Sequence, residues 1–347
     1  MLQNNSKNIF WINAVKAICI LAVYFVHCQL YYGYWLQGVN VFIHPIYVNG
    51  FFFISGYLLF RKQLSELLIG QSLSAYALGG GKKLLSNIVF KIAIPSIIFS
   101  TFEYLPKKLL RGEAITMHTF LSNTIGGGTY WFTSALVVAE ISVLFILLSR
   151  NRSMLAYCVG GIFIAALGWY LIHIDFHLFG FGRDPWAYRR GFLAVAFLVA
   201  GGLYWRYEEE ISHTINNVVL FAMLLAYLFL FGCYSKHFPV LISTMDITWI
   251  GYIAALLGCV LLIELCKRMH EIKALAFVGQ FSLCYYFLSG ALPMIVSMVA
   301  KRILPADNFC GLICVFLVCV TIATLVTYIL NRYQPWLFDL KKIQIKK

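Results

Sequence analysis

The sequence predicts an all-α fold, a polytopic membrane helix bundle with about ten transmembrane helices. Hydrophobic residues make up 61% of the 347 positions and charged residues only 12%, with a mean hydropathy of +0.81. A soluble globule of this length needs more polar surface than such a composition supplies. The apolar residues also gather in segments of about 20 residues, the length that crosses a bilayer as a helix.

The apolar segments follow one another along the whole chain. They are residues 9–31, 41–60, 85–104, 129–149, 154–173, 190–206, 215–233, 247–266, 275–299 and 309–330. In the ninth, Gly279, Gly290 and Pro293 interrupt the pattern, so a helix break inside the bundle is expected there. No Pro-rich or low-complexity linker divides the sequence, which favours a single integral-membrane domain over residues 1–347.

The distribution of positive charge predicts the orientation. With the N-terminus in the cytoplasm, 17 of the Lys and Arg residues fall on the inner side and nine on the outer side, while Lys16 lies within the first span. Cytoplasmic loops carry the excess of positive charge, so both termini are predicted to be cytoplasmic. The basic residues stand in short clusters between apolar runs, which argues against a nucleic-acid partner despite a formal net charge of +13.

The cysteines and histidines show no spacing that would recruit a metal. Cys19, Cys158 and Cys259, for example, sit singly in apolar runs, as small buried hydrophobic residues do. No metal site is therefore expected.

The first segment contains a polar stripe. Lys16 and His27 stand eleven positions apart, and at about 100° per residue they lie within roughly 20° of one helix face. Asn13, one turn before Lys16, extends the stripe. A lysine without a partner in mid-bilayer costs about 2.5 to 3.5 kcal/mol on insertion scales, so Lys16 indicates a polar partner, a water-filled cavity or a bound anion.

Two long polar connections contain glycine runs. Residues 61–84 are expected to lie on the inner side, with Gly79–Gly81 directly before Lys82 and Lys83. Such a run beside lysines can wrap a phosphate, but the Walker spacing is absent and a flexible connection is the alternative. Residues 105–128 are expected to lie on the outer side and end in a second glycine run.

Several motifs occur together in the order of a known family. Asn13, Lys16 and His27 have the spacing of its opening pattern, which is an acidic residue, a basic residue three later and a histidine after ten more. The aromatic, Ser-Gly-Tyr run at residues 52–57 matches its second span. With these motifs the chain resembles acyltransferase family 3, the multi-span membrane O-acyltransferases of bacterial surface polysaccharides.

Further motifs extend the resemblance over nearly the whole chain. A basic inner loop leading to a proline matches Lys82 to Pro95, and a Trp-aromatic-x-x-Ala-Leu motif matches residues 131–136. Near the end, residues 279–289 match a Gly-x-x-Ser-Leu motif. The chain departs from the family pattern at three positions: Asn13 replaces the acid, Lys16 is the less common basic residue, and Ser289 stands where a histidine is often found.

The resemblance implies an O-acyltransferase that moves acetyl from acetyl-CoA to a hydroxyl of a cell-surface or exported carbohydrate, in the inner membrane and in contact with its lipid. His27 is the candidate base, because removing the proton of an alcohol requires a group with a pKa near neutral. It lies about 16 Å along the helix from Lys16, which is expected to hold an anion. The alternative is an interfacial histidine that is hydrogen-bonded to a neighbouring helix.

Two further groups of residues are candidates for ligand binding. Arg61, Lys82 and Lys83, on the inner side, are expected to bind the phosphates of acyl-CoA. On the outer side, Arg189 and Arg190 are expected to hold acidic groups of the acceptor, with Trp186 stacked on a sugar ring. A membrane-interface belt is the alternative for this outer cluster. For the whole protein, the alternative function is a transporter or flippase for a glycan or lipid-linked substrate.

Overall fold

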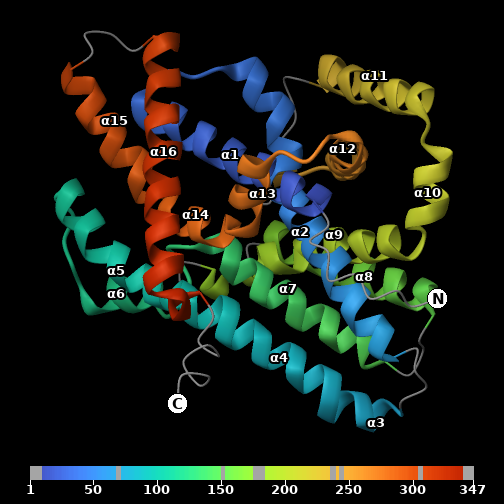
Figure 1. Cartoon of the computed structure of the whole chain (residues 1–347). Coiled ribbons are helices and arrows are strands. Elements are labelled where there is room, and N and C mark those ends of the chain that lie inside the picture. Colours follow the sequence, from blue (N-terminus) through green and yellow to red (C-terminus); the bar gives the residue numbers. More distant parts are fainter. Residues whose placement is uncertain are drawn as a thin grey trace. The chain divides into compact units, whose positions relative to one another are not determined.

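A computed structural model describes residues 10–67, 72–149, 153–174, 184–234, 240–241, 246–303 and 308–338. Within these residues the chain is almost entirely helical (Figure 1), which confirms the all-α prediction. Two short strands, β1 (Val240–Leu241) and β2 (Asp246–Ile247), pair with each other. The two chain ends, which are predicted to be cytoplasmic, lie outside the described residues.

The described helices confirm a polytopic membrane bundle. Six of them are long and apolar enough to cross a membrane, and the number is eight if each of two bent helix pairs forms one span. The six lie at residues 10–32, 37–64, 73–109, 154–173, 250–268 and 309–333, and the bent pairs at 208–230 and 282–303. All ten predicted segments contain helix, but α7 (Trp131–Leu147) and α9 (Tyr188–Arg206) are not among the six to eight.

The third span begins earlier than the sequence suggested. Helical structure runs from α3 (Leu73–Tyr76) through η1 (Ala77–Gly81), α4 (Lys82–Ile88) and η2 (Val89–Ala93) to α5 (Ile94–Arg111). The prediction of a loop at the first glycine run is therefore wrong, because these glycines form the π-helical turn η1. A glycine costs a helix about 1 kcal/mol, which the surrounding apolar helix is able to offset.

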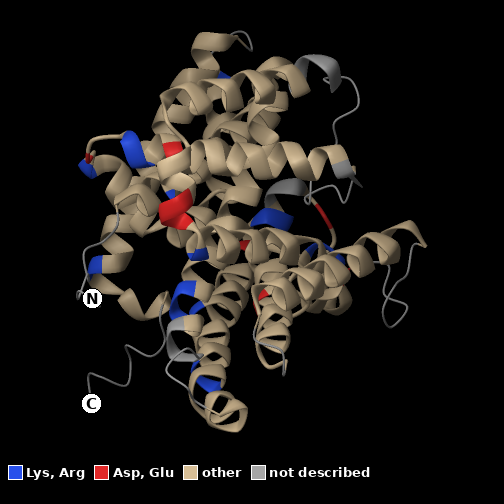
Figure 2. Ribbon diagram, turned by 90° about the vertical axis from the view of Figure 1, so that its right-hand side faces the viewer, with Lys and Arg blue, Asp and Glu red and all other residues tan. Residues whose placement is uncertain are grey.

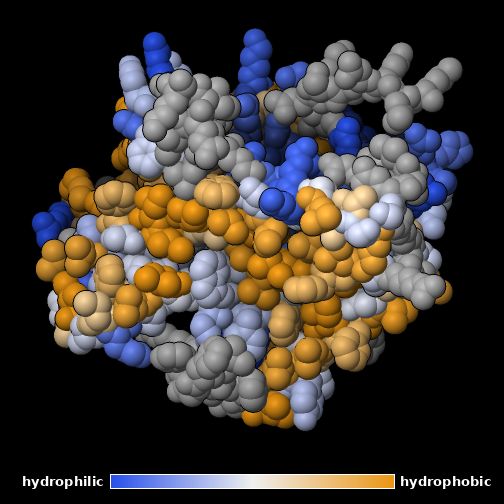
Figure 3. All heavy atoms as spheres, turned by 90° about the horizontal axis from the view of Figure 1, so that it is seen from below, coloured by the Kyte–Doolittle hydropathy of each residue, from blue (hydrophilic) through white to orange (hydrophobic). Residues whose placement is uncertain are grey.

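The surface of the protein matches a lipid environment. Large apolar side chains are exposed on α8 (Met154–His173), α11 (Asn217–Tyr234) and α16 (Phe309–Tyr333), among them Phe163, Phe229 and Leu325. Apolar side chains cover much of the face seen in Figure 3. Charged residues occupy short stretches of the ribbon, and most helical turns carry none (Figure 2). Apolar surface on this scale is unusual for a soluble protein and normal for a membrane bundle.

The chain divides into two compact units. Unit 1 contains residues 1–51, 210–240 and 248–329, and unit 2 contains residues 52–209, 241–247 and 330–347. The boundaries fall within α2 (Gln37–Leu67), within α10 (Glu208–Thr214) and near the end of α16, so these helices belong to both units.

In unit 1, α1 (Phe10–Tyr32) is the central helix. It packs against α12 (Trp249–Arg268), α13 (Lys273–Gln280), α14 (Ser282–Leu288) and α15 (Ala291–Ile303). Its C-terminus closes at Gly33, which has a positive φ of 87° and whose N–H donates to the Gln29 carbonyl. The buried side-chain amides of Gln29 and Asn40 exchange hydrogen bonds of 2.8 and 2.9 Å, which fixes the turn between α1 and α2.

In unit 2, α9 packs against the second part of α2 and against α7 and α8. A Cβ on Gly56 would lie 2.0 Å from the Leu198 oxygen, and one on Gly201 would lie 2.0 Å from the Phe53 oxygen. The α2 and α9 backbones therefore touch, as small residues allow in membrane bundles. The remaining elements of this unit are α6 (Met117–Asn123), η4 (Pro185–Ala187) and η5 (Pro335–Leu337).

Candidate functional site

The polar stripe lies on α1, on the face turned toward the C-terminal helices of unit 1. Asn13 is buried, whereas Lys16 and His27 are partly buried. No hydrogen bond or ion pair joins Lys16 to another residue that the structure describes. The expected acidic partner of Lys16 is absent from position 13, and the structure supplies no other in the described residues. A partly buried lysine in such a position requires a compensating anion or water, and the described residues provide no such anion.

His27 contacts the break between α14 and α15. Its Nδ1 atom lies 2.6 Å from the backbone oxygen of Ser289, which caps the C-terminus of α14. The two helices meet at a bend of 50° (Figure 1). In an unbroken helix the N–H four residues later would bond this oxygen, but that residue is Pro293, which has no N–H. The His27 side chain satisfies a carbonyl that the helix cannot.

A second side chain of α1 donates a hydrogen bond to a backbone oxygen near the same break. The Tyr24 hydroxyl donates to the Tyr285 oxygen over 2.9 Å, and both residues are fully buried. The Ser289 N–H donates to the backbone oxygen of Tyr286 at 3.1 Å, and the Ser289 Oγ donates to the same oxygen at 2.8 Å. The Tyr285 oxygen is thereby released from its usual helical bond. Tyr24 and His27, one turn apart on α1, hold the bent pair in place from one side.

The contact with Ser289 determines which nitrogen of His27 carries the proton. A carbonyl oxygen can only accept, so Nδ1 must donate and the neutral ring carries its basic lone pair on Nε2. An imidazole held in this way is prepared to take a proton at Nε2. The hydrogen bond to a neighbouring helix and the role of a base, stated as alternatives from the sequence, are therefore compatible.

The motif near residue 279 packs against the start of the stripe. A Cβ on Gly279 would lie 1.8 Å from the backbone oxygen of Asn13, so α13 approaches α1 backbone to backbone. This contact lies one helical turn before Lys16. The first and the last motifs of the resemblance are therefore in contact within unit 1.

The inner basic candidates belong to unit 2. Lys82 and Lys83 are exposed on α4, in the first third of the long third span at residues 73–109. Arg61 lies on α2, one turn after Tyr57, whose hydroxyl donates to Glu208 over 2.5 Å. Lys82 and Lys83 thus provide two exposed ammonium groups that are adjacent in the sequence.

The structure gives the two arginines of α9 different surroundings. The Arg189 side chain is 5% exposed and its Nε lies 3.1 Å from Oδ1 of Asp184, which is 8% exposed. Burial raises the pKa of Asp184 above its ordinary value, while the Arg189 guanidinium opposes this shift. Arg190 lies over the ring of Trp131, 5.2 Å from its centroid. Arg189 therefore has a carboxylate partner within the protein. Arg190 lies over Trp131, a contact that the sequence analysis does not predict.

Trp186 lies in a strained turn at the start of α9. Trp186 and Ala187 have positive φ values of 55° and 47°, which are uncommon for residues other than glycine. The Trp186 N–H donates to the Gly126 oxygen over 2.7 Å. This bond joins the turn to the second glycine run.

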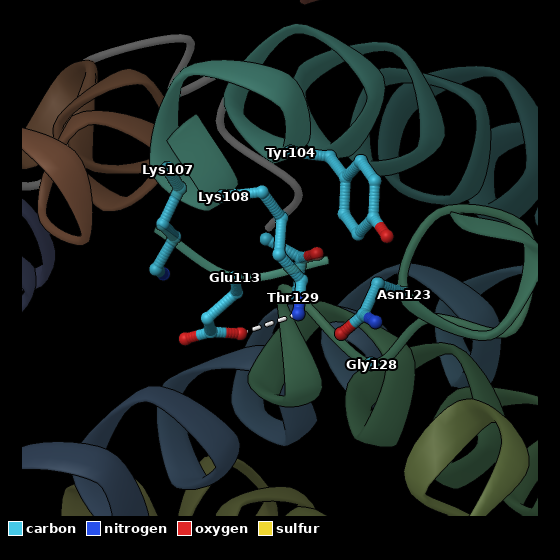
Figure 4. A pocket seen from close by; sticks show the side chains of 7 residues that line it. All are labelled: Tyr104, Lys107, Lys108, Glu113, Asn123, Gly128 and Thr129. Atoms are coloured by element: carbon cyan, nitrogen blue, oxygen red, sulfur yellow. Dashed lines mark hydrogen bonds and ion pairs between the residues drawn. The ribbon is translucent and has the colours of Figure 1, made fainter. Parts of the chain in front are cut away.

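Unit 2 also contains a polar pocket between α5 and α6, which we term the α5–α6 pocket. Its volume is about 240 Å³, and Figure 4 shows the side chains that line it. It is lined by Tyr104, Lys107, Lys108, Glu113, Asn123, Gly128 and Thr129. Lys107 pairs with Glu103 at 3.2 Å and Lys108 pairs with Glu113. Its residues come from four places in the sequence, which explains why no motif indicated it.

Two of these features are not indicated by any motif in the sequence. The break expected at Pro293 leaves the oxygen of Ser289, four residues earlier, without its helical donor, and no pattern marks that oxygen. Asp184, the partner of Arg189, lies only five residues before it, but no motif in the sequence indicates that the two side chains pair. Within the described residues, no group of three or more His, Cys, Asp or Glu side chains is placed to hold a metal.

Comparison with known proteins identifies a family. A family model for an acyltransferase domain matches residues 9–332, which covers both compact units. No curated protein and no solved structure matches the chain.

Proposed function

The chain belongs to the acyltransferase 3 family of membrane proteins, and from this premise we propose that it transfers acetyl from acetyl-CoA to a hydroxyl of a cell-surface or exported carbohydrate. The observation that carries the proposal is the contact of His27 Nδ1 with the Ser289 oxygen. It gives a membrane-embedded histidine the tautomer that a general base requires. Family membership supplies the class of reaction, and the contact supplies a candidate for the group that performs it.

The proposed chemistry begins at the acceptor hydroxyl. His27 Nε2 takes the hydroxyl proton while the oxygen forms a bond to the thioester carbonyl carbon. The carbon–sulfur bond then breaks, and the proton passes from His27 to the departing sulfur, which gives the ester and free CoA. The Ser289 carbonyl stabilises the transient imidazolium by accepting its Nδ1–H, as an aspartate does in a Ser-His-Asp triad.

The proposed ligand-binding roles follow the positions of the cations. Lys16 binds an anionic group beside the stripe, because it is partly buried without a described partner. Lys82 and Lys83, with Arg61, bind phosphates of the donor. Of the outer candidates, Arg190 and Trp186 are proposed to contact the acceptor, and Arg189 supports their turn through Asp184.

We further propose an inner-membrane location with both termini in the cytoplasm. The support is the uneven distribution of Lys and Arg, 17 against nine. Cysteine-accessibility labelling tests this orientation. Residues 105–128 should be labelled from outside the cell, whereas the C-terminal tail should be protected until the membrane is permeabilised. Labelling of the tail from outside would overturn the orientation.

A transporter or flippase for a glycan or lipid-linked substrate is the second candidate. It is favoured by the two bent helix pairs, with bends of 90° and 50°, because broken helices often line transport sites. The deciding experiment is mass spectrometry of surface glycans from cells with and without the protein. The proposal predicts glycans heavier by the mass of one acetyl group only when the protein is present. Substrate movement without covalent change would favour the transporter.

A further inference from the structure

The α5–α6 pocket has the charge balance of a site for an uncharged ligand. Each of its two lysines is paired with a carboxylate: Lys108 pairs with Glu113, which also lines the pocket, and Lys107 pairs with Glu103, which is not itself a lining residue. Glu103 and Lys107 are 7% and 24% exposed, so this pair is largely withdrawn from solvent. An acidic ligand would have to compete with a carboxylate that is already in place. The four charges together provide no excess of either sign.

The polar groups that remain suit a molecule rich in hydroxyls. Each ammonium has three N–H donors, and a single carboxylate contact leaves others for a ligand. Asn123 and Thr129 add an amide and a hydroxyl, and the Tyr104 ring forms an apolar wall (Figure 4). A sugar hydroxyl both donates and accepts, so mixed donors and acceptors beside an aromatic wall match a pyranose better than they match an anion or an acyl chain.

The walls of the pocket are fixed by contacts within unit 2. The Tyr104 hydroxyl bonds to Thr119 at 2.6 Å, and Thr116 and Thr119 form a capping box at the start of α6. The Asn123 Nδ2 donates to the Thr119 oxygen over 2.6 Å. On the other wall, the Thr129 N–H donates to the Asn123 oxygen over 3.0 Å. A pocket held in this way loses little conformational entropy when a ligand binds.

The same loop connects the pocket to the strained turn at Trp186. The Ser134 Oγ donates to the Gly127 oxygen over 3.0 Å, and the Gly126 oxygen accepts from the Trp186 N–H. Gly127 has a positive φ of 76°, which brings the chain back from the pocket toward this turn. The loop that forms one wall of the pocket is therefore hydrogen-bonded to the turn that contains Trp186.

We propose that the α5–α6 pocket binds a neutral sugar unit of the acceptor, through Lys108, Asn123 and Thr129. This inference rests on the proposed function, because it names the chemistry of the acceptor. It assigns the pocket to recognition of the glycan and gives it no part in the acyl transfer itself. A polymer that contains neutral hexose units is thus the expected acceptor class, in preference to one composed of uronic acids alone.

Saturation-transfer NMR on the full-length protein in detergent tests the proposal. The probes are methyl glycosides of glucose, galactose, mannose and rhamnose, with methyl glucuronide as the acidic comparison and glycerol as the blank. At least one neutral glycoside should give a signal that the glucuronide and glycerol do not give. A signal from the glucuronide alone, or from no neutral glycoside, would overturn the proposal.

Matched variants locate the binding. Thr129→Val and Lys108→Gln, combined, remove hydrogen bonds from the pocket and should weaken the affinity for the neutral glycoside about tenfold or more. Thr101→Val is the control, because Thr101 is exposed on α5 and its hydroxyl bonds only the Ile97 oxygen among the described residues. Unchanged affinity in the double variant would place the sugar elsewhere.

A His27→Ala protein separates this proposal from the proposed function. It should bind the neutral glycoside as the parent does, because the pocket makes no use of His27. Binding without acyl transfer in the parent would leave the pocket standing and remove the enzymatic function. Acyl transfer by the double variant with an unaltered KM for the acceptor would support the enzymatic function and overturn the role of the pocket.

Discussion

The Nδ1 atom of His27 and the backbone oxygen of Ser289 lie 2.6 Å apart, although the two residues are separated by 262 positions in the chain. Ser289 stands where the family often has a histidine. In this chain its backbone, and not its side chain, contacts the histidine of α1. The contact exists because Pro293 cannot donate to the same oxygen.

Replacing Pro293 with alanine should disturb this contact. The new N–H would compete for the Ser289 oxygen, and His27 would lose its fixed tautomer. We expect a fall in kcat of about ten- to hundredfold with little change in KM, since small displacements of a catalytic group have effects of this size. The Pro45→Ala variant, which also restores an N–H inside a helix, is the control and should keep the parent rate. An unchanged kcat in Pro293→Ala would show that activity does not depend on the missing N–H of Pro293.

The close approach of α13 to α1 predicts a strong effect at Gly279. Its Cβ would lie 1.8 Å from the Asn13 oxygen, so Gly279→Ala forces the two helices apart and should cost about 1 to 3 kcal/mol of stability. Gly38→Ala is the matched control, because nothing lies within 4 Å of its Cβ. That substitution should be neutral or slightly stabilising. Thermal unfolding in detergent measures both, and equal midpoints would contradict the packing described for α13.

The two arginines of α9 should respond differently to substitution. Arg189→Gln leaves the Asp184 carboxylate buried without its partner, and breaking a buried pair costs about 3 to 5 kcal/mol. Arg190→Gln loses its position over Trp131, worth about 0.5 to 2 kcal/mol, and a charge interaction with Asp184 that is smaller than that of Arg189. We therefore expect the first variant to unfold at a markedly lower temperature. The second should stay folded and raise the KM for the acceptor. The reverse order of stabilities would show that the roles are exchanged.

The exposed lysines of α4 should contribute to donor affinity. Lys82→Ala with Lys83→Ala should raise the Kd for acetyl-CoA between about two- and thirtyfold, because exposed ion pairs contribute about 0.2 to 1 kcal/mol each. The loss should shrink as salt concentration rises. Calorimetry on the purified protein measures the affinity, with Lys273→Ala, another exposed lysine of the predicted inner set, as control. An unaltered Kd would leave the pair as a topology signal alone.

Hydropathy was sufficient to predict the class of fold and the presence of helix in all ten segments, because lipid requires every backbone group to be satisfied within the segment. The predicted break near Pro293 also lies between α14 and α15. The glycine run before Lys82 misled the prediction, because glycine favours loops in water and is tolerated in a helix held by apolar neighbours. Helix periodicity also placed Lys16 and His27 on one face.

The surroundings of those residues depended on tertiary contacts. The partner of His27 is a backbone oxygen, and every residue has one, so no residue pattern indicates that Ser289 supplies it. The α5–α6 pocket combines side chains of two helices and two loops. The Lys108–Glu113 pair forms across the turn that ends α5, whereas Glu103 and Lys107 form an i,i+4 pair within that helix. The joining of these parts into one pocket arises from the fold and not from local sequence.

The central claim is that His27 is the base, and single-turnover acyl transfer by the His27→Ala variant tests it most directly. The parent and the variant are purified in detergent, matched by gel filtration, and mixed with radiolabelled acetyl-CoA and surface glycan. General-base catalysis contributes roughly 10² to 10⁴-fold, so the account predicts a rate lower by at least about 10²-fold in the variant. Transfer by folded His27→Ala protein at near the parent rate would contradict it.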